Sequence, residues 1–209
     1  TISTLRGLEV EIEHQNPLEW DERAGWADFV IANPPIGLSL ARLGGFSIAG
    51  VTNLPEPPQR DGEWAFMVKA IEKLAPGGTA YITTAGSLAR SGGASADFRR
   101  QLLQGGYLRG IVSLPMLRRA RTGTSVTMWI LGEYDRSRET VLMVDASRAT
   151  ASDLARGGPV ASQIKSGLES VTTGPRNGLA VQVPIRDLLT REVNLRPEPW
   201  VARDNAEQD

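Results

Sequence analysis

The sequence predicts an α/β fold with parallel strands, and three observations indicate it. The apolar run at residues 29–32 has the length and composition of a buried strand. Apolar residues recur at helical spacing over residues 64–74, and the turn Pro76-Gly77-Gly78 follows them. Residues 79–84 read as a second strand. A strand, a helix and a second strand in this order are typical of a parallel βαβ unit.

The other elements follow from the same criteria. Residues 10–13 alternate apolar and charged side chains, as a half-exposed strand does. Helices are predicted at 98–103, 162–171 and 185–190, and strands at 108–115 and 181–185. Residues 203–209 are polar, and we expect this tail to fray.

Two loops are predicted beside the strands. Residues 37–62 contain too many glycines and prolines for a regular element. A loop of this length is more often functional than not. Two interpretations stay open for it: a flap that closes over a substrate, and a disordered surface segment. The glycine-rich residues 86–93 lack the Gly-Lys-Ser/Thr of a phosphate loop, and we expect them at the same edge of the sheet.

The composition of the 209-residue chain excludes several classes of protein. No apolar stretch approaches the ~18–20 residues of a membrane helix, and we expect no signal peptide. The absence of cysteine excludes disulfides and thiol chemistry. The single histidine, His14, leaves no set of ligands for zinc. We therefore predict a cytoplasmic protein without a membrane partner or a metal site.

The segment Asn33-Pro34-Pro35-Ile36 follows the strand at 29–32 and is the most specific signal in the sequence. Ligands of open α/β sheets bind at the carboxyl ends of the strands. Because proline lacks an N–H and restricts the residue before it, Asn33 is held extended and the carbonyls around Pro34 are free to accept hydrogen bonds. Such acceptors suit the two hydrogens of an exocyclic amine, whose lone pair then becomes available for methylation. The alternative is a Pro-Pro turn that only ends a core strand.

Residues 28–37 resemble the catalytic motif of amino-group DNA methyltransferases, in particular the methylation subunits of type I restriction-modification systems. The helix, Pro-Gly-Gly turn and strand at 64–84 are widespread in Rossmann-like methyltransferases. Further segments are similar to those subunits in order and spacing: 98–103, 108–115, 122–131, 140–147 and 193–201. The resemblance therefore covers most of the chain.

The resemblance implies a Rossmann-like methyltransferase sheet and methyl transfer from S-adenosylmethionine to N6 of a flipped-out adenine in DNA. Asn33 and the Pro34 carbonyl would accept the amine hydrogens, Pro35 would fix the turn and Ile36 would pack on the base. A specificity subunit or a target-recognition domain is the implied partner. We accordingly divide the chain into the C-terminal part of a catalytic domain at 1–149 and an appendage or linker at 150–209.

The chain departs from the family pattern upstream of Asn33. In the resembling family, a glycine-rich turn and an acidic residue that hold the cofactor precede this strand, but the residues before it here contain no such turn. We therefore expect an incomplete sheet that lacks the cofactor-binding first strands, with the S-adenosylmethionine site completed by residues upstream. Such a sheet exposes an edge and an apolar face, so we expect self-association or pairing with the missing half.

Ile36 is a second departure, because the family usually has an aromatic residue there that stacks on the base. Base–aromatic stacking is worth ~1–3 kcal/mol, and its loss favours reduced or absent activity. Another aromatic residue, such as Phe46 in the following loop, is the candidate replacement.

The net charge of −1 is unexpected for a protein that binds DNA. Arginines are nevertheless dense between residues 90 and 121, where Asp97 is the only acid. The candidates for DNA contact are Arg90, Arg118, Arg119 and Arg121, the last three in a predicted loop after a strand. The alternative is a general preference for arginine over lysine throughout the chain.

Two further functions stay open. One is a catalytically degenerate DNA-binding or assembly module of a defence complex, which Ile36, the missing cofactor turn and the net charge favour. The other is methylation of a protein glutamine or an RNA base, which also uses Asn-Pro-Pro turns. The segments after residue 108 favour the DNA family over the latter.

Overall fold

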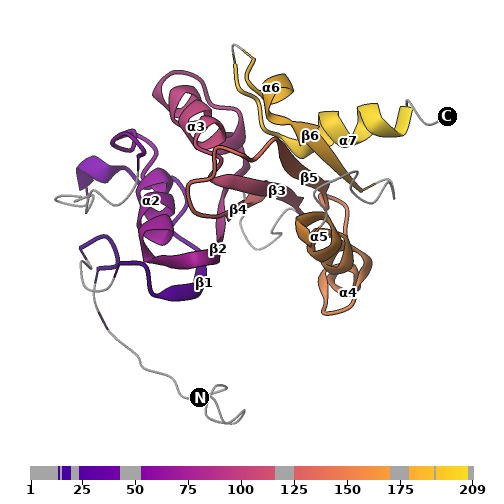
Figure 1. The fold of residues 1–209 in the computed structure, drawn as a ribbon, viewed down its shortest axis with the longest axis horizontal. Helices are drawn as coiled ribbons and strands as arrows, with labels where there is room; N and C mark the ends of the chain where they lie inside the picture. Colours follow the sequence, from indigo (N-terminus) through magenta and orange to yellow (C-terminus); the bar gives the residue numbers. More distant parts are fainter. Residues whose placement is uncertain are drawn as a thin grey trace, which may run out of the picture.

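The computed structural model describes residues 14, 16–19, 24–42, 53–115, 125–169, 179–190 and 192–206. Within them a single six-stranded sheet forms the centre of the molecule (Figure 1), with the strand order β1-β2-β4-β3-β5-β6. The strands are β1 (Ala27–Ala32), β2 (Leu74–Ala85), β3 (Leu108–Leu114), β4 (Val126–Leu131), β5 (Thr140–Asp145) and β6 (Ala180–Pro184). The predicted α/β class is therefore confirmed.

The strand directions place four carboxyl ends at one edge of the sheet. β1 pairs parallel with β2, and β3 pairs parallel with β5. β4 lies between β2 and β3 and runs antiparallel to both, so β2 and β3 point the same way. The chain segments that follow β1, β2, β3 and β5 therefore meet at a common edge, which is where open α/β sheets bind ligands.

Helices cover the two faces of the sheet unequally. The longer helices are α2 (Glu63–Lys73), α3 (Ala94–Gln104), α5 (Pro159–Glu169) and α7 (Pro197–Ala206), and the short ones are η1 (Leu40–Arg42), η2 (Gly86–Ala89), α4 (Ala151–Leu154) and α6 (Ile185–Leu188). Apolar residues of α2 and α3 form the main core with the first face. On the second face, α5 packs through a smaller core onto the β3, β4 and β5 side (Figure 1).

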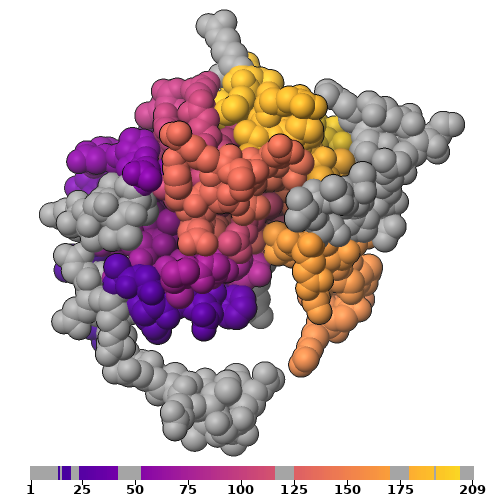
Figure 2. All heavy atoms as spheres, in the orientation of Figure 1, coloured from indigo at the N-terminus to yellow at the C-terminus, as the bar shows by residue number. Residues whose placement is uncertain are grey.

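The β1 end of the second face lacks such a cover among the described residues. Val30 and Ala32 point to the first face and pack against the main core. Phe29 and Ile31, which alternate with them, point the other way and are 71% and 84% exposed. The indigo β1 lies on the outside of the molecule in Figure 2. The prediction that the strand at 29–32 is parallel is thus confirmed. The prediction that it is buried is wrong for one face, because no described element covers β1 on that side.

Several boundaries differ from the predictions. β2 begins directly after α2, so Pro76-Gly77-Gly78 lies inside the strand as an irregularity: Ala27 pairs with Leu74, and Phe29 already pairs with Thr79. The predicted frayed tail is in part helical, because α7 extends to Ala206. Residues 86–93 contain the short helix η2 rather than only a loop.

The segment predicted as an appendage contributes to the same sheet. β6 pairs antiparallel with β5, and α7 packs against β3, β5 and β6. The division at 149/150 stays a prediction. The strand predicted at 10–13 lies outside the described residues, as does the middle of the predicted flap, residues 43–52, which includes Phe46.

Candidate functional site

Asn33 lies at the carboxyl edge of the sheet, directly after β1. Its neighbour there is Thr83, because Ala32 pairs with Ile82 in the parallel register of β1 and β2. The Thr83 hydroxyl donates a hydrogen bond of 2.5 Å to Asn33 Oδ1. A carbonyl oxygen has two lone pairs, so this bond fixes the orientation of the side chain and leaves Oδ1 with capacity for one more donor.

Asn33 also lines a cleft of about 460 Å³ beside the uncovered part of the second face. The cleft is mostly apolar, and its remaining lining residues come from β1, β2, the ends of β3 and β4, and α4: Ile31, Ala32, Tyr81, Thr83, Leu114, Pro115, Val126, Met128 and Leu154. An apolar cleft with a few convergent polar groups is the usual form of a small-ligand site. Two of its polar groups, the Asn33 amide and the Thr83 hydroxyl, lie together.

The turn after Asn33 is half in the core and half in solvent. Pro34 is buried, whereas Pro35 is exposed and Ile36 is 47% exposed. Gly37 has a φ of +75°, which favours glycine, and its N–H donates to Glu63 Oε1 over 3.0 Å. Ile36 does not line the cleft, and the aromatic residue among the lining residues is Tyr81.

Thr83, Tyr81 and Glu63 are the residues of this site that sequence reasoning missed. Tyr81 and Thr83 alternate in the strand predicted at 79–84, and that alternation would have placed both on one face. The face of the sheet on which they lie, and the strand that lies beside them, depend on tertiary packing and not on the local sequence. Glu63 precedes the helix predicted at 64–74 and gave no signal in the sequence.

Of the four candidate arginines, the described residues include Arg90. Arg90 is exposed after η2, close to the carboxyl end of β2. Arg118, Arg119 and Arg121 lie outside the described residues. Two other arginines of the dense segment do not face this edge: Arg99 is fully buried, and Arg109 donates to Thr79 at the amino ends of the strands.

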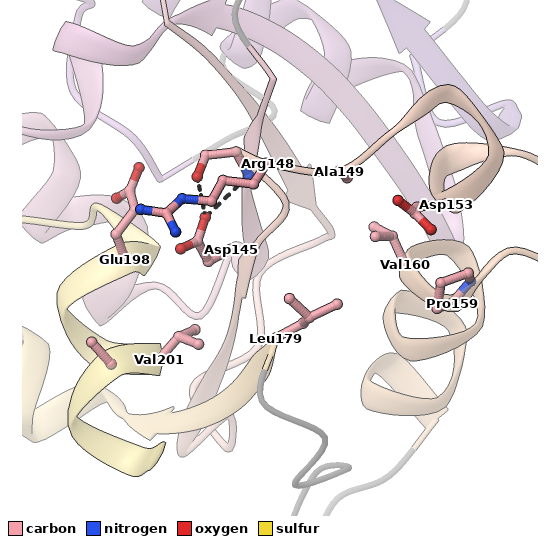
Figure 3. Close-up of a pocket in the computed structure, with 11 residues that line it drawn as sticks. Asp145, Arg148, Ala149, Asp153, Pro159, Val160, Leu179, Glu198 and Val201 are labelled. Atoms are coloured by element: carbon pink, nitrogen blue, oxygen red, sulfur yellow. Dashed lines mark hydrogen bonds between the residues drawn. The ribbon is translucent and has the colours of Figure 1, made fainter. Parts of the chain in front are cut away.

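A larger cavity of about 560 Å³ lies at the carboxyl end of β5, between α5 and α7. Figure 3 shows Arg148 pointing toward Glu198 of α7, with Val160 and Leu179 on the opposite side. Two of its carboxylates already have local donors, since Asp145 accepts from Ser147 and Asp153 accepts from Thr150. This cavity and the Asn33 cleft share no lining residue. We place the candidate active site in the Asn33 cleft, because that cleft contains the Asn33 side chain at the carboxyl end of β1.

The described residues provide neither a metal site nor a membrane-spanning helix. Across the described ranges, no group of three or more His, Cys, Asp or Glu side chains could hold a metal ion. Nor does this part of the chain contain a helix that is long and apolar enough to cross a membrane.

Comparison with solved structures shows which class of fold carries the site. A type I restriction-modification methyltransferase subunit from Streptococcus thermophilus has a TM-score of 0.70 at 20% identity, over 93% of this chain and 43% of that one. A Vibrio vulnificus protein assigned as a type I modification subunit has a TM-score of 0.60 at 18% identity, with the same coverage of both chains. A Listeria monocytogenes protein assigned as a class I S-adenosylmethionine-dependent methyltransferase has a TM-score of 0.54 at 18% identity, over 81% and 50%.

These likenesses show the fold of the S-adenosylmethionine-dependent methyltransferases, and this chain spans less than half of the first two proteins. The predicted Rossmann-like methyltransferase sheet is therefore confirmed. No curated protein sequence matches the chain. The family model for N-6 DNA methylases matches residues 3–208, and the chain belongs to that family. The resemblance seen at residues 28–37 is thereby confirmed at the level of the family.

Proposed function

We propose that the chain carries the target-base site of a DNA adenine-N6 methyltransferase. The observation that supports this most is the orientation of Asn33 Oδ1, which Thr83 holds in the lining of an apolar cleft at the carboxyl edge of the sheet. In this proposal Asn33 Oδ1 and the Pro34 carbonyl accept the two N6 hydrogens of an adenine flipped out of the duplex. Withdrawing those hydrogens from the ring plane makes the nitrogen more pyramidal and directs its lone pair outward.

The remaining residues of the turn shape the site. Pro34 is buried and anchors the turn in the core, while Pro35 restricts the backbone on its outer side. Ile36 is half-exposed and would give the base an apolar contact. The apolar lining of the neighbouring cleft supports a site that accepts an uncharged ring.

S-adenosylmethionine, when bound, supplies a methyl group on a sulfonium. The described residues near β1 provide neither a glycine-rich turn nor an acidic side chain at a strand end for the cofactor. They do provide an open edge of β1 beside Asn33. We therefore propose that another polypeptide segment, added at this edge, completes the cofactor site and that Asn33 presents the amine toward it.

The replacement Asn33→Ala tests the role of the amide. We expect methylation of adenine in DNA by the completed enzyme to fall about 10²–10³-fold, the usual effect of losing one hydrogen bond of the transition state. Tritiated methyl transfer from S-adenosylmethionine to duplex DNA is the measurement. Asn53→Ala is the matched control, because Asn53 is an exposed asparagine outside the site. Methylation that survives Asn33→Ala unchanged would refute the proposed role.

The uncovered face of β1 supports a polypeptide partner for the completed enzyme. Parallel strands are ordinarily covered on both faces, and an open edge offers unpaired backbone groups. The second face of β1 is not covered, since Phe29 and Ile31 are exposed there and Trp26 beside them is half-exposed. β1 is also an edge strand, so its outer backbone groups are open. We propose that the cofactor-binding segment pairs with β1 and covers these side chains. A second copy of the chain is the competing occupant.

The replacement Ile31→Glu tests this face. We expect it to abolish association with the cofactor-binding segment, and any self-association of the chain, because a charge would be buried against an apolar partner. Sedimentation velocity over a range of concentrations measures both. Tyr134→Glu is the control, since Tyr134 is also exposed but belongs to the turn after β4. A monodisperse, well-folded wild-type monomer that binds no such segment would count against the proposal.

DNA contact and the wider assembly are further parts of the proposal. Arg90 is exposed at the active edge, and we assign it a contact with a DNA phosphate, together with Arg118, Arg119 and Arg121. A specificity subunit or target-recognition domain would choose the sequence that is methylated. The type I methyltransferase subunits that share the fold support this assignment.

A second candidate function is a catalytically degenerate DNA-binding or assembly module. It is favoured by Ile36, which is not aromatic and does not line the cleft. Calorimetric titration with S-adenosylmethionine separates the two candidates: binding by the completed protein supports the enzyme, and its absence supports the module.

A further inference from the structure

Glu63 is a buried carboxylate beside the candidate active site. It is 3% exposed and stands in the first turn of α2. Its Oε1 accepts the N–H of Gly37 over 3.0 Å, and Gly37 directly follows the Asn33–Ile36 segment in sequence. The carboxylate therefore contacts the backbone of the turn that carries Asn33.

The burial of Glu63 calls for a physical reason, because a buried charge is costly unless it is paired or hydrogen-bonded. Among the described residues, no basic side chain forms an ion pair with it. The compensating interactions are the Gly37 N–H and the positive end of the α2 dipole, since Glu63 is the first residue of that helix. The first of these two interactions, the hydrogen bond from the Gly37 N–H, comes directly from the active-site turn.

Two further hydrogen bonds join the segment after the turn to the residues before α2. The Gly62 N–H donates to the Leu38 carbonyl over 2.6 Å, and the Leu40 N–H donates to the Gln59 carbonyl over 2.9 Å. A Cβ on Gly62 would lie 2.7 Å from the Leu38 oxygen, so a side chain at this position would separate the two segments. The chain that leaves the active-site turn is thus fastened to the residues that lead into α2.

This attachment matters because β1 is a weak support for the turn. β1 is an edge strand with one exposed face, whereas α2 is anchored in the main core by fully buried side chains such as Trp64. The position of the turn relative to the core is therefore set to a large extent by α2. Glu63 is the side chain through which α2 reaches it.

We propose that Glu63 is a positioning residue for methyl transfer. Its carboxylate holds the Asn33–Gly37 turn, so that Asn33 Oδ1 and the Pro34 carbonyl stay where the amine needs them, and Glu63 itself does not touch the substrate. This inference rests on the proposed function of Asn33. Loss of the attachment lets the turn shift, and a misplacement of about 1 Å is enough to cost a reaction on the order of 10²-fold.

The test compares Glu63→Met, which removes the acceptor at similar size, with Glu63→Gln, which keeps a carbonyl oxygen in its place. Glu56→Met is the matched control, because Glu56 is an exposed glutamate nearby in the chain. The first readout is the hydrogen-exchange rate of the Gly37 amide by NMR on the chain itself. We expect it to rise roughly tenfold in E63M and to stay unchanged in E63Q and E56M.

The second readout is steady-state methylation by the completed enzyme. We expect kcat to fall about 10–100-fold in E63M with KM for DNA and for S-adenosylmethionine unchanged, and E63Q to restore it. Wild-type Gly37 exchange or wild-type kcat in E63M would overturn the inference, as would an equal loss of kcat in E63Q. If Asn33→Ala leaves methylation intact, the proposed function fails, but Gly37 exchange still reports whether Glu63 holds the turn.

Discussion

Replacing Arg99 with methionine should lower the free energy of unfolding by about 3–5 kcal/mol, because several backbone carbonyls would lose their charged hydrogen-bond donor. Arg99 is fully buried in α3. Its guanidinium donates to the carbonyl oxygens of Val193 over 2.8 Å, Leu88 over 2.8 Å, Ser91 over 2.6 Å and Glu192 over 3.3 Å. It therefore joins α3 to the chain around η2 and to the segment that leads into α7.

The size of this effect follows from the acceptors. They are backbone carbonyls, so no substitution at residue 99 removes them, and those left without a donor in the interior cost about 1–3 kcal/mol each. Burial lowers the pKa of Arg99 to about 10, with Asp61 acting to raise it and Arg100 to lower it. The guanidinium thus remains charged at neutral pH. The bond to Val193 also supports a strained backbone, because that β-branched residue has a φ of +45°.

Urea unfolding followed by tryptophan fluorescence measures the effect as a shift of the midpoint. The control is Arg100→Met, because Arg100 is the next residue of the same helix and forms an ion pair of 2.7 Å with Asp97 at the surface. Surface ion pairs contribute about 0–1 kcal/mol. Equal midpoints for the two variants would show that the guanidinium of Arg99 does not hold these segments together.

The replacement Gly106→Ala should cost a comparable amount, about 3–5 kcal/mol. Gly106 follows α3 with a φ of +66°, and a Cβ there would overlap the carbonyl oxygen of Asp135. The turn that contains Asp135 cannot easily withdraw. Asp135 N–H donates to the Gly105 carbonyl over 2.9 Å, and Arg138 Nε donates to the Gly106 carbonyl over 2.9 Å.

Gly157→Ala separates the two causes of this cost. Gly157 also has a positive φ, of +81°, but a Cβ there would meet nothing within 4 Å. Its replacement should cost only the backbone strain of about 1–2 kcal/mol. Thermal unfolding by calorimetry compares the three proteins. If both alanine variants unfold at the same temperature, the close approach of Asp135 does not constrain residue 106.

Positions of helices and strands were largely predictable from the chain, because they depend on local patterns. The periodicity at 64–74 corresponds to α2, and the β-branched and apolar runs correspond to β3 and β6. The predicted boundaries of helices and strands were wrong where tertiary contacts decide them. Pro76-Gly77-Gly78 would normally end a helix, yet β1 pairs with residues on both sides of it and draws it into β2.

Features that join distant segments could not be predicted in this way. The order of the sheet departs from the order of the chain, since β4 lies between β2 and β3. Arg99 and Arg109 belong to the same arginine-rich segment as Arg90, and only the packing shows that Arg99 is buried and that Arg109 faces the opposite edge. Charge patterns in sequence do not show which side chains reach the surface.

The sequence by itself determined the α/β class, the family and the Asn33-Pro34-Pro35 turn, because proline geometry and hydrophobic periodicity act over a few neighbouring residues. The tertiary structure alone decided what surrounds that turn. Thr83, 50 residues away, orients the Asn33 side chain, and Glu63 binds the backbone of Gly37, 26 residues before it. It also decided that one face of β1 stays exposed, because coverage depends on which elements lie above a strand and not on the residues within it.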